Sequence, residues 1–257
     1  MASTGYISPL RWRKAELHSH CNLDPADYRV CSHSAEQLIS EAAGLGYEIL
    51  AITCHNRDIW NRELADYAEN LGITLIPGME VSTEGPRHVL AYNFRTGPEN
   101  LNTLAKIRAL SNEDTLVIAP HPFFPGRLCL RGRVVQHIDV FDALEHSGFY
   151  LPGIDFNRRV RRLALKHDKP VVGNGDVHML WQLGRTCTWI YSEPGVSAIL
   201  SAIKRGSVRL ETTPLSYSDV VRFWASTLWR YLFPVNPPPA KPVGELEICH
   251  KFHELHE

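Results

Sequence analysis

Short apolar runs alternate with segments of helical periodicity from residue 14 to about residue 212. This alternation is typical of strand–helix units that repeat around a parallel sheet. Eight runs have the length and composition of strands, at residues 15–18, 48–53, 73–77, 88–93, 115–119, 140–144, 170–173 and 186–191. The chain has 257 residues, a length within the range of one α/β barrel. We therefore expect a single α/β domain with a short appendage.

The clearest helix signal follows the first of these strands. Ser34 is a good N-cap residue, and Gln37 three positions later completes a capping box. Leu38 and Ala42 then recur on one helical face, as in an amphipathic helix. Further helices are expected at about 58–70, 99–110, 154–167 and 195–205.

The composition changes after residue 213, so we divide the chain into a domain at 14–213 and an appendage at 214–257. Apolar residues four apart predict an amphipathic helix over 216–233. We expect it to pack on the domain; a contact in a homo-oligomer and a membrane surface are the alternatives. Arg222 and Arg230 argue against a bilayer span. A proline-rich linker and a polar tail, expected to be extended and disordered respectively, would follow.

Histidines and acids stand where the predicted strands end. The chain has 13 histidines, and histidine is the commonest metal ligand. His18 and His20 close the first strand, and residues two apart in a strand point to the same side. His55, Glu80, His121, Asp176 and His178 likewise end or follow predicted strands, and His88 opens the strand at 88–93. Because parallel strands of a barrel gather their carboxyl ends on one face, we predict a metal cluster there.

These motifs, in this order, resemble the PHP (polymerase and histidinol phosphatase) superfamily. The matching segments are His18-Ser-His20, Thr53-Cys-His55-Asn, Gly78-Met-Glu80, His88, Pro120-His121-Pro and Gly175-Asp176-Val-His178. The resemblance covers residues 14 to about 212. It implies a distorted, seven-stranded, TIM-like (β/α) barrel with two or three divalent metal ions at the carboxyl ends of its strands.

Carried over by motif position, the resemblance implies three ion positions. His18, His20, Glu80 and Asp176 would hold the first ion, and Glu80 would bridge to a second held with His88 and His121. His55 and His178 would hold a third, together with a residue after His20, for which we choose Asp24 over Asp27 and His33. The second motif departs from the family pattern, because Cys54 replaces the usual aspartate. This replacement removes a carboxylate that could orient a ligand or carry a proton.

This ligand set suggests hydrolysis of phosphoesters. A bridged metal pair activates water and neutralises charge on a phosphoryl group. Mixed histidine and carboxylate ligands suit Zn, Mn or Fe. Glu80 and the histidines would position the ions, and His178 or His55 could protonate the leaving alkoxide if metal does not occupy it. The expected substrate is a small phosphorylated metabolite or a nucleotide.

Arginines near the predicted site are candidates for binding phosphate. Arg127, in the loop after His121, is the first candidate and Arg57 is the second, with simple solvent exposure as the alternative for both. Glu145 shares its strand phase with apolar residues and is expected beside the ligands, whereas His146 should point away. We interpret the arginines at 158, 159, 161 and 162 as a solvated helix face. The histidines at 250, 253 and 256 are interpreted as incidental.

The charge and the cysteine content of the chain argue against several classes of protein. The net charge of −1 argues against strong nucleic-acid binding by bulk electrostatics. Six cysteines without a Cys-x-x-Cys pair argue against a disulfide scaffold or a cysteine zinc site. No signal-peptide-like segment and no long apolar run is present, so we expect a cytoplasmic protein. A polynucleotide-directed nuclease or proofreading activity and a non-catalytic metal-binding regulatory module remain the alternatives to a small-molecule phosphoesterase.

Overall fold

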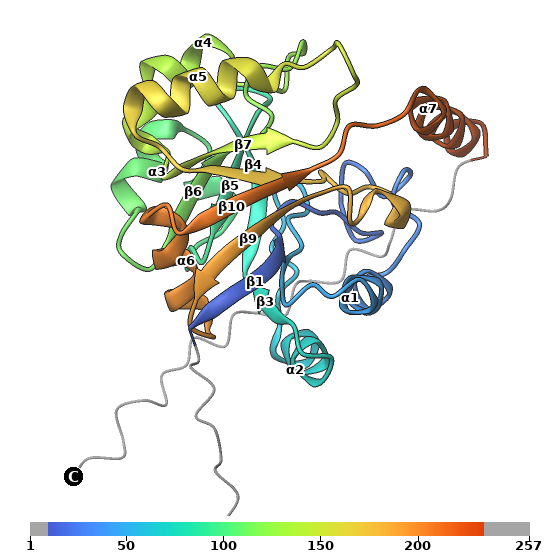
Figure 1. The fold of residues 1–257 in the computed structure, drawn as a ribbon, viewed down its shortest axis with the longest axis horizontal. Coiled ribbons are helices and arrows are strands. Elements are labelled where there is room, and N and C mark those ends of the chain that lie inside the picture. Colours follow the sequence, from blue (N-terminus) through green and yellow to red (C-terminus); the bar gives the residue numbers. More distant parts are fainter. Residues whose placement is uncertain (1–9, 234–257) are drawn as a thin grey trace, which may run out of the picture.

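The computed structural model describes residues 10–233 (Figure 1). The predicted proline-rich linker, polar tail and tail histidines lie outside the described residues.

The described strands form two mixed sheets of five strands each. The first has the order β10 (Val208–Thr212), β9 (Thr186–Ser192), β1 (Arg11–Glu16), β2 (Ile49–Ala51), β3 (Thr74–Ile76). The second has the order β4 (Gly78–Thr83), β5 (Arg87–Tyr92), β6 (Leu116–Ala119), β7 (Ala143–Ser147), β8 (Val171–Asn174). Only β1–β2–β3 and β6–β7–β8 pair in parallel, and the other neighbours are antiparallel.

The predicted (β/α) barrel is therefore wrong for the described residues. Pro77 separates β3 from β4 and marks the passage of the chain from one sheet to the other. Only three residues join β4 to β5, with positive φ at Glu84 (49°) and Gly85 (94°). Such a loop makes an antiparallel hairpin, whereas a parallel crossover needs a dozen or more residues.

The contact between β8 and β9 explains further why the strands do not close a barrel. Here the Thr188 hydroxyl accepts a hydrogen bond from the Gly173 N–H at 2.8 Å and donates one to the Gly173 carbonyl at 2.9 Å. A side chain thus occupies the backbone groups that strand pairing would use.

Seven helices of the described residues pack on or beside the two sheets. They are α1 (Ala35–Gly44), α2 (Arg62–Asn70), α3 (Leu104–Leu110), α4 (Gly132–Gln136), α5 (Asn157–His167), α6 (Val196–Lys204) and α7 (Tyr217–Leu232). Three single 3₁₀ turns lie at Pro98–Asn100, Ile138–Val140 and Leu180–Gln182. The capping box of Ser34 and Gln37 is confirmed at α1. The other predicted helices also form, and α4 was not predicted.

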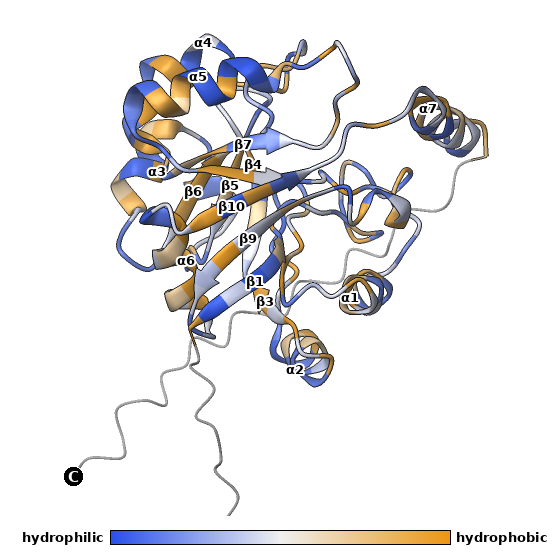
Figure 2. Ribbon diagram, in the orientation of Figure 1, coloured by the Kyte–Doolittle hydropathy of each residue, from blue (hydrophilic) through white to orange (hydrophobic). Residues whose placement is uncertain are grey.

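The core fills the space between the two sheets. Residues of both sheets, such as Ile49 and Leu90, pack with Ile199, Leu200 and Ile203 of α6 in one buried cluster. Two further clusters lie between the first sheet and α1–α2 and between the second sheet and α3–α5. Figure 2 shows apolar colour on strands such as β6 and on parts of the helices that pack on the sheets.

Helix α7 lies at the edge of the molecule (Figure 1). It contacts the domain through an ion pair between Asp219 and Arg185 at 2.9 Å and through the rings of Phe223 and Phe149, whose centroids lie 5.0 Å apart. Across residues 10–233, no helix is both long enough and apolar enough to cross a membrane.

Candidate metal centre

The two sheets meet at the ends of the strands that carry the predicted ligands. The segments after β1 and β8 run side by side, because the His20 N–H donates to the Val177 carbonyl at 2.8 Å and the Val177 N–H donates to the His18 carbonyl at 3.1 Å. His55, after β2, forms an isolated bridge with Glu80 of β4. These backbone contacts bring residues of four separate motifs together.

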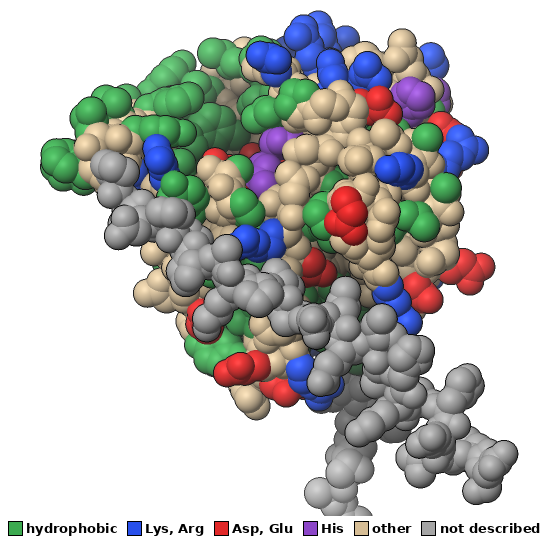
Figure 3. Space-filling model, turned by 180° about the vertical axis from the view of Figure 1, so that it is seen from behind, with side chains coloured by type: hydrophobic (Ala, Val, Ile, Leu, Met, Phe, Trp, Pro, Cys, Tyr) green, Lys and Arg blue, Asp and Glu red, His purple; other side chains and the backbone are tan. Residues whose placement is uncertain are grey.

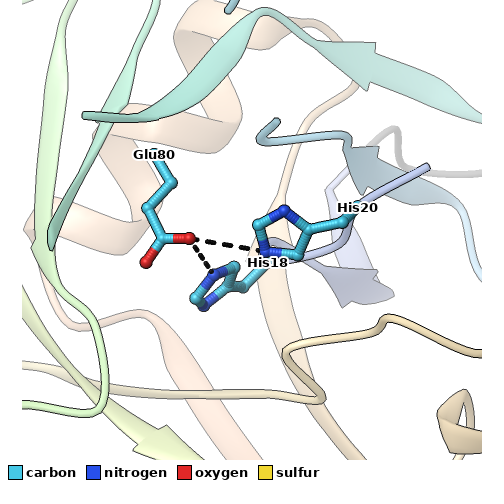
Figure 4. A group of neighbouring side chains, drawn as sticks. All are labelled: His18, His20 and Glu80. Carbon is cyan, nitrogen blue, oxygen red and sulfur yellow. Dashed lines mark hydrogen bonds and ion pairs between the residues drawn. The ribbon is translucent and has the colours of Figure 1, made fainter. Parts of the chain in front are cut away.

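Glu80 is the hub of the cluster, and its side chain is almost fully buried. Its Oε2 lies 3.2 Å from His18 Nε2 and 3.4 Å from His20 Nε2 (Figure 4). The same oxygen lies 3.1 Å from His55 Nε2. Its Oε1 lies 2.8 Å from His88 Nδ1 and 3.3 Å from His121 Nε2. Burial alone would raise the pKa of Glu80, but the surrounding histidines hold it well below its usual range.

Asp176 faces the first motif from the opposite side. Its Oδ1 lies 3.4 Å from the Nε2 atoms of both His18 and His20 and 3.5 Å from His178 Nδ1. Asp176 has a φ of 49°, in the left-handed region that non-glycine residues seldom adopt. Such costly conformations persist where the surrounding structure fixes them, commonly at functional sites.

The acids after His20 lie near His55 and His178. Asp24 Oδ2 is 2.8 Å from His20 Nδ1 and 3.0 Å from His55 Nδ1, and it accepts the His55 N–H at 2.8 Å. Asp27 Oδ2 lies 3.1 Å from His178 Nε2 and 3.4 Å from His55 Nδ1, so this more exposed carboxylate sits between the two histidines. His33 Nε2 donates to the His20 carbonyl oxygen at 2.8 Å. The choice of Asp24 as ligand stays a prediction.

The residues present fit divalent cations. Five groups of three residues place one ligand atom each within 4.8 Å of one another, and together they include all nine predicted ligands. His20 Nε2 is fully buried and has no hydrogen-bond partner within residues 10–233. Because buried polar atoms almost always find a partner, this nitrogen fits a metal ligand. The imidazole and carboxylate donors suit Zn, Mn or Fe.

Several buried residues orient these ligands. Glu145 Oε1 lies 2.9 Å from His18 Nδ1, and its Oε2 accepts the His121 N–H at 2.6 Å. As expected from the strand phase, Glu145 points toward the ligands. His146 points to the other side of the strand, where its Nδ1 lies 3.3 Å from Arg161 Nη1. Cys129 was not foreseen, and its Sγ lies 3.4 Å from His121 Nδ1.

Glu16 was also missed by the sequence analysis. It is fully buried and accepts the backbone N–H groups of His18 at 3.0 Å and Gly175 at 2.9 Å. Burial raises its pKa to about 8. The sequence did contain a signal for Glu16. It is an acidic residue two positions before His18, so both side chains point to the same side of an otherwise apolar strand end.

Cys54 occupies the position where the second motif departs from the family pattern. Its Sγ lies 3.7 Å from Cys21 Sγ, and both residues are buried. The Asp24 carboxylate contacts both the backbone N–H and Nδ1 of His55. Asp24 therefore orients the ligand His55 from another part of the chain. This is one of the two roles that the aspartate usual at position 54 could have had.

The two candidate arginines differ in their surroundings. Arg57 donates to the Leu23 carbonyl at 2.9 Å and is thereby tied to the loop that carries Asp24. Arg127 is exposed and lines a hollow with Cys129 and Arg131, outside the ligand cluster. Its role stays a prediction.

Comparison with known proteins links these observations. A family model described as PHP-associated matches residues 155–208. The uncharacterised protein MJ1587 of Methanocaldococcus jannaschii is 23% identical over 163 residues, which cover 60% of this chain and 95% of that protein.

Two crystal structures have a similar fold. One is a two-domain protein from Bacteroides vulgatus that contains a predicted PHP-like metal-dependent phosphoesterase, with a TM-score of 0.61 and 17% identity over 85% of this chain and 71% of that one. The other is PsfC from Pseudomonas syringae, with a TM-score of 0.55 and 19% identity over 87% of this chain and 99% of that one. The PHP-associated match and the shared fold support the resemblance to the PHP superfamily that the motifs indicated.

Proposed function

We propose that this protein is a metal-dependent phosphoesterase. The observation that carries the proposal is the position of Glu80, whose two carboxylate oxygens face two different sets of histidines. A carboxylate placed in this way can bridge a metal pair. When bound, such a pair supplies a nucleophile near neutral pH and neutralises charge on a phosphoryl group.

The residues of the chain divide into three roles. His18, His20, His88, His121 and Asp176 would hold the ions together with Glu80, and Glu145 orients two of these histidines. His178 and Asp27 lie at the open side of the cluster, with side chains 15% and 30% exposed. They are placed to reach a substrate, so His178, with His55 behind it, is our candidate for moving a proton to the leaving group.

The proposed substrate is a small phosphorylated metabolite or a nucleotide. The chain carries 27 basic and 28 acidic residues, which supports a compact substrate over a long polynucleotide. Hydrolysis of polynucleotides and a non-catalytic metal-binding role are the competing functions. Arg127 would position the phosphate from the loop after His121.

The test compares hydrolysis of p-nitrophenyl phosphate and bis-p-nitrophenyl phosphate with added Mn, together with elemental analysis of the purified protein. We expect turnover by the wild type and loss of both metal and turnover in Glu80→Ala. Asp176→Asn, a milder change at a partly exposed residue, should lose most turnover while remaining folded. Asp66→Asn, which alters an exposed carboxylate paired with Arg62, is the matched control and should behave as wild type.

Two results would contradict the proposal. Bound metal without turnover of either ester would favour the non-catalytic role. Turnover retained in both Glu80→Ala and Asp176→Asn would place the active site elsewhere. The ratio of rates on the two esters separates a monoesterase from a diesterase.

A further inference from the structure

A basic cavity lies between the loop after His121 and the start of α5. It has a volume of about 570 Å³ and is lined by Arg131, Arg158, Arg159, Arg162, Phe123 and Phe156, among others. Asp155 is the single acid in its lining. Figure 3 shows basic side chains along the edge of the molecule, above a recess in which histidines are visible.

The guanidinium groups of this cavity are largely unpaired. Asp155 Oδ2 is taken by Arg161, whose Nη2 lies at 2.8 Å, and Arg158 Nε is 3.9 Å away. Within residues 10–233, the side chains of Arg131, Arg159 and Arg162 have no hydrogen bond or ion pair. Like charges around one hollow repel each other, and a bound anion would remove that repulsion. The planar guanidinium fork matches phosphate oxygens.

Arg131 has a strained backbone at the edge of this cavity. Its φ of 52° and ψ of −121° lie outside the regions open to residues with a side chain. The Arg131 N–H donates to the Pro122 carbonyl at 2.7 Å, which fixes the chain in this conformation. Retained strain of this kind occurs mainly where function requires it.

Both walls of the cavity are attached to the metal centre. The loop wall begins at His121, and the His88 N–H donates to the Leu128 carbonyl of the same loop at 2.8 Å. The helical wall is the start of α5, where the Asn157 side chain bonds the backbone of Ser147 at the end of β7 in two places, each at 3.0 Å. The two segments that line the cavity are therefore joined to the metal centre through the chain and through these hydrogen bonds.

We propose that this cavity is a phosphate-binding site for a nucleotide-like ligand. The four arginines would bind phosphate groups, and Phe123 and Phe156 offer apolar contact to an aromatic base. This proposal rests on the proposed function in one respect, since the same molecule would present a phosphoester to the metal centre. Three of the four arginines that we interpreted from the sequence as a solvated face thus acquire a ligand, and Arg161 remains paired with Asp155.

The test is calorimetric titration of the full-length protein with adenosine 5′-diphosphate and with adenosine. We compare wild type, the double variant Arg159→Gln/Arg162→Gln, and a matched control, Arg205→Gln/Arg209→Gln, which alters two exposed arginines outside the cavity. We expect the cavity variant to bind the diphosphate at least tenfold more weakly. The control should bind as wild type, and adenosine should bind much more weakly to all three.

An unchanged diphosphate affinity in the cavity variant, or no binding by the wild type, would overturn the proposal. Turnover of p-nitrophenyl phosphate distinguishes this failure from failure of the proposed function. If the wild type turns over the ester but the cavity variant binds the diphosphate normally, only the cavity proposal fails. If no protein turns over the ester but the cavity variant still loses diphosphate binding, only the proposed function fails.

A second, independent observation concerns α7, which leaves most of its large apolar side chains exposed. Tyr217, Val221, Trp224, Leu228 and Tyr231 recur at alternating intervals of four and three residues, and each is 58% exposed or more. Trp229, Leu232 and Phe233 are exposed to a similar degree. We call these eight residues the α7 face. An aromatic side chain has an area of roughly 200 Å², so at the exposures given above the α7 face exposes on the order of 800 Å² of apolar surface. Monomeric proteins usually expose apolar patches of only a few hundred Å².

We infer that the α7 face binds a second copy of this chain. Its area matches the roughly 800 Å² that each partner buries in a stable interface. The spacing of its residues is that of a helix which pairs with its own copy. The polar side of α7 is already held by the domain through Asp219 and Arg185, unlike the solvated, strongly basic side of a helix that lies on a membrane.

The test is the molar mass of the full-length protein by light scattering after size exclusion. We expect a dimer for wild type and for Ser218→Asp, and a folded monomer for Trp224→Asp/Leu228→Asp. A wild-type monomer at all concentrations would overturn the inference. Monomeric wild type that sediments with phosphatidylserine vesicles would assign the face to a membrane surface instead.

Discussion

Glu145→Gln should weaken metal binding although it removes no predicted ligand. The Glu145 carboxylate contacts His18 Nδ1 at 2.9 Å, accepts the His121 N–H at 2.6 Å and accepts the Asn174 side-chain N–H at 2.9 Å. Glutamine keeps the shape of the side chain but offers only one acceptor oxygen. At least one of these contacts must therefore be lost, and the orientation of His18 or His121 is released.

The expected magnitude follows from the role of such supporting contacts. Their loss typically lowers metal affinity about 10- to 100-fold, which corresponds to about 1.4–2.7 kcal/mol. The assay is competition with a chelating dye, together with thermal unfolding of the chelated protein. We expect the dye to remove metal from Glu145→Gln at correspondingly lower concentrations.

Asp142→Asn is the matched control for this prediction. Asp142 also accepts a backbone N–H, from Val117 at 2.8 Å, but it has no contact with the ligand set within the part of the chain described. Both variants should lose some stability, and only Glu145→Gln should lose metal affinity. Equal affinities for Glu145→Gln and wild type, or an equal loss in Asp142→Asn, would refute the reasoning.

Three further predictions concern stability. Burial and the nearby Arg161 lower the pKa of His146 to about 4. Below pH 6.5 the unfolded chain therefore binds a proton that the folded chain does not. The free energy of unfolding should consequently fall by about 3 kcal/mol between pH 6.5 and pH 4. Denaturant unfolding across this range should show a smaller pH dependence in His146→Gln than in wild type, and equal slopes would contradict the prediction. Cys54→Asp introduces the residue usual in this motif, but it would bury a carboxylate near Cys21 and Asp24. It should therefore lower the free energy of unfolding in urea by about 3 kcal/mol. Cys54→Ala buries no charge and should lower it by only about 1 kcal/mol. Gly173→Ala would place a methyl group against Leu210 and 3.1 Å from Thr186 Cγ2. The unfolding temperature of this variant should drop by an amount that corresponds to about 1–3 kcal/mol. An unchanged unfolding temperature would show that β8 and β9 separate easily.

The sequence allowed accurate prediction of most elements but not of how the strands pair. Each predicted strand overlaps an observed one, because buried strands carry compact apolar runs between turn residues. The 78–83 strand was missed because it follows β3 after Pro77 alone, with no turn segment between the two strands. The β10 strand was missed because none of its residues is fully buried. Direction of pairing depends on loop geometry, such as the positive φ at Glu84, which apolar periodicity does not encode.

The candidate site was predictable where residues follow strands in fixed motifs. Asn174 contacts Glu145 only through the tertiary fold, and no local spacing identifies it. Glu16 stands two residues before His18, but its contact with Gly175 likewise depends on the tertiary fold. The same holds for the basic cavity, because Arg131 and Arg162 come from segments 31 residues apart that meet only when the loop after His121 lies against α5.

The junction between the two sheets has a consequence for the stability of the whole protein. His18, His20 and His55 extend from strands of the first sheet, whereas Glu80, His88 and His121 belong to the second or to its connections. A cation held by both groups would link the two halves of the fold. Unfolding would then release it, and stability would grow with the free metal concentration, by about 2.7 kcal/mol at 100 times the dissociation constant. The amount of folded protein in a cell would therefore follow the metal supply, independently of any effect on catalysis.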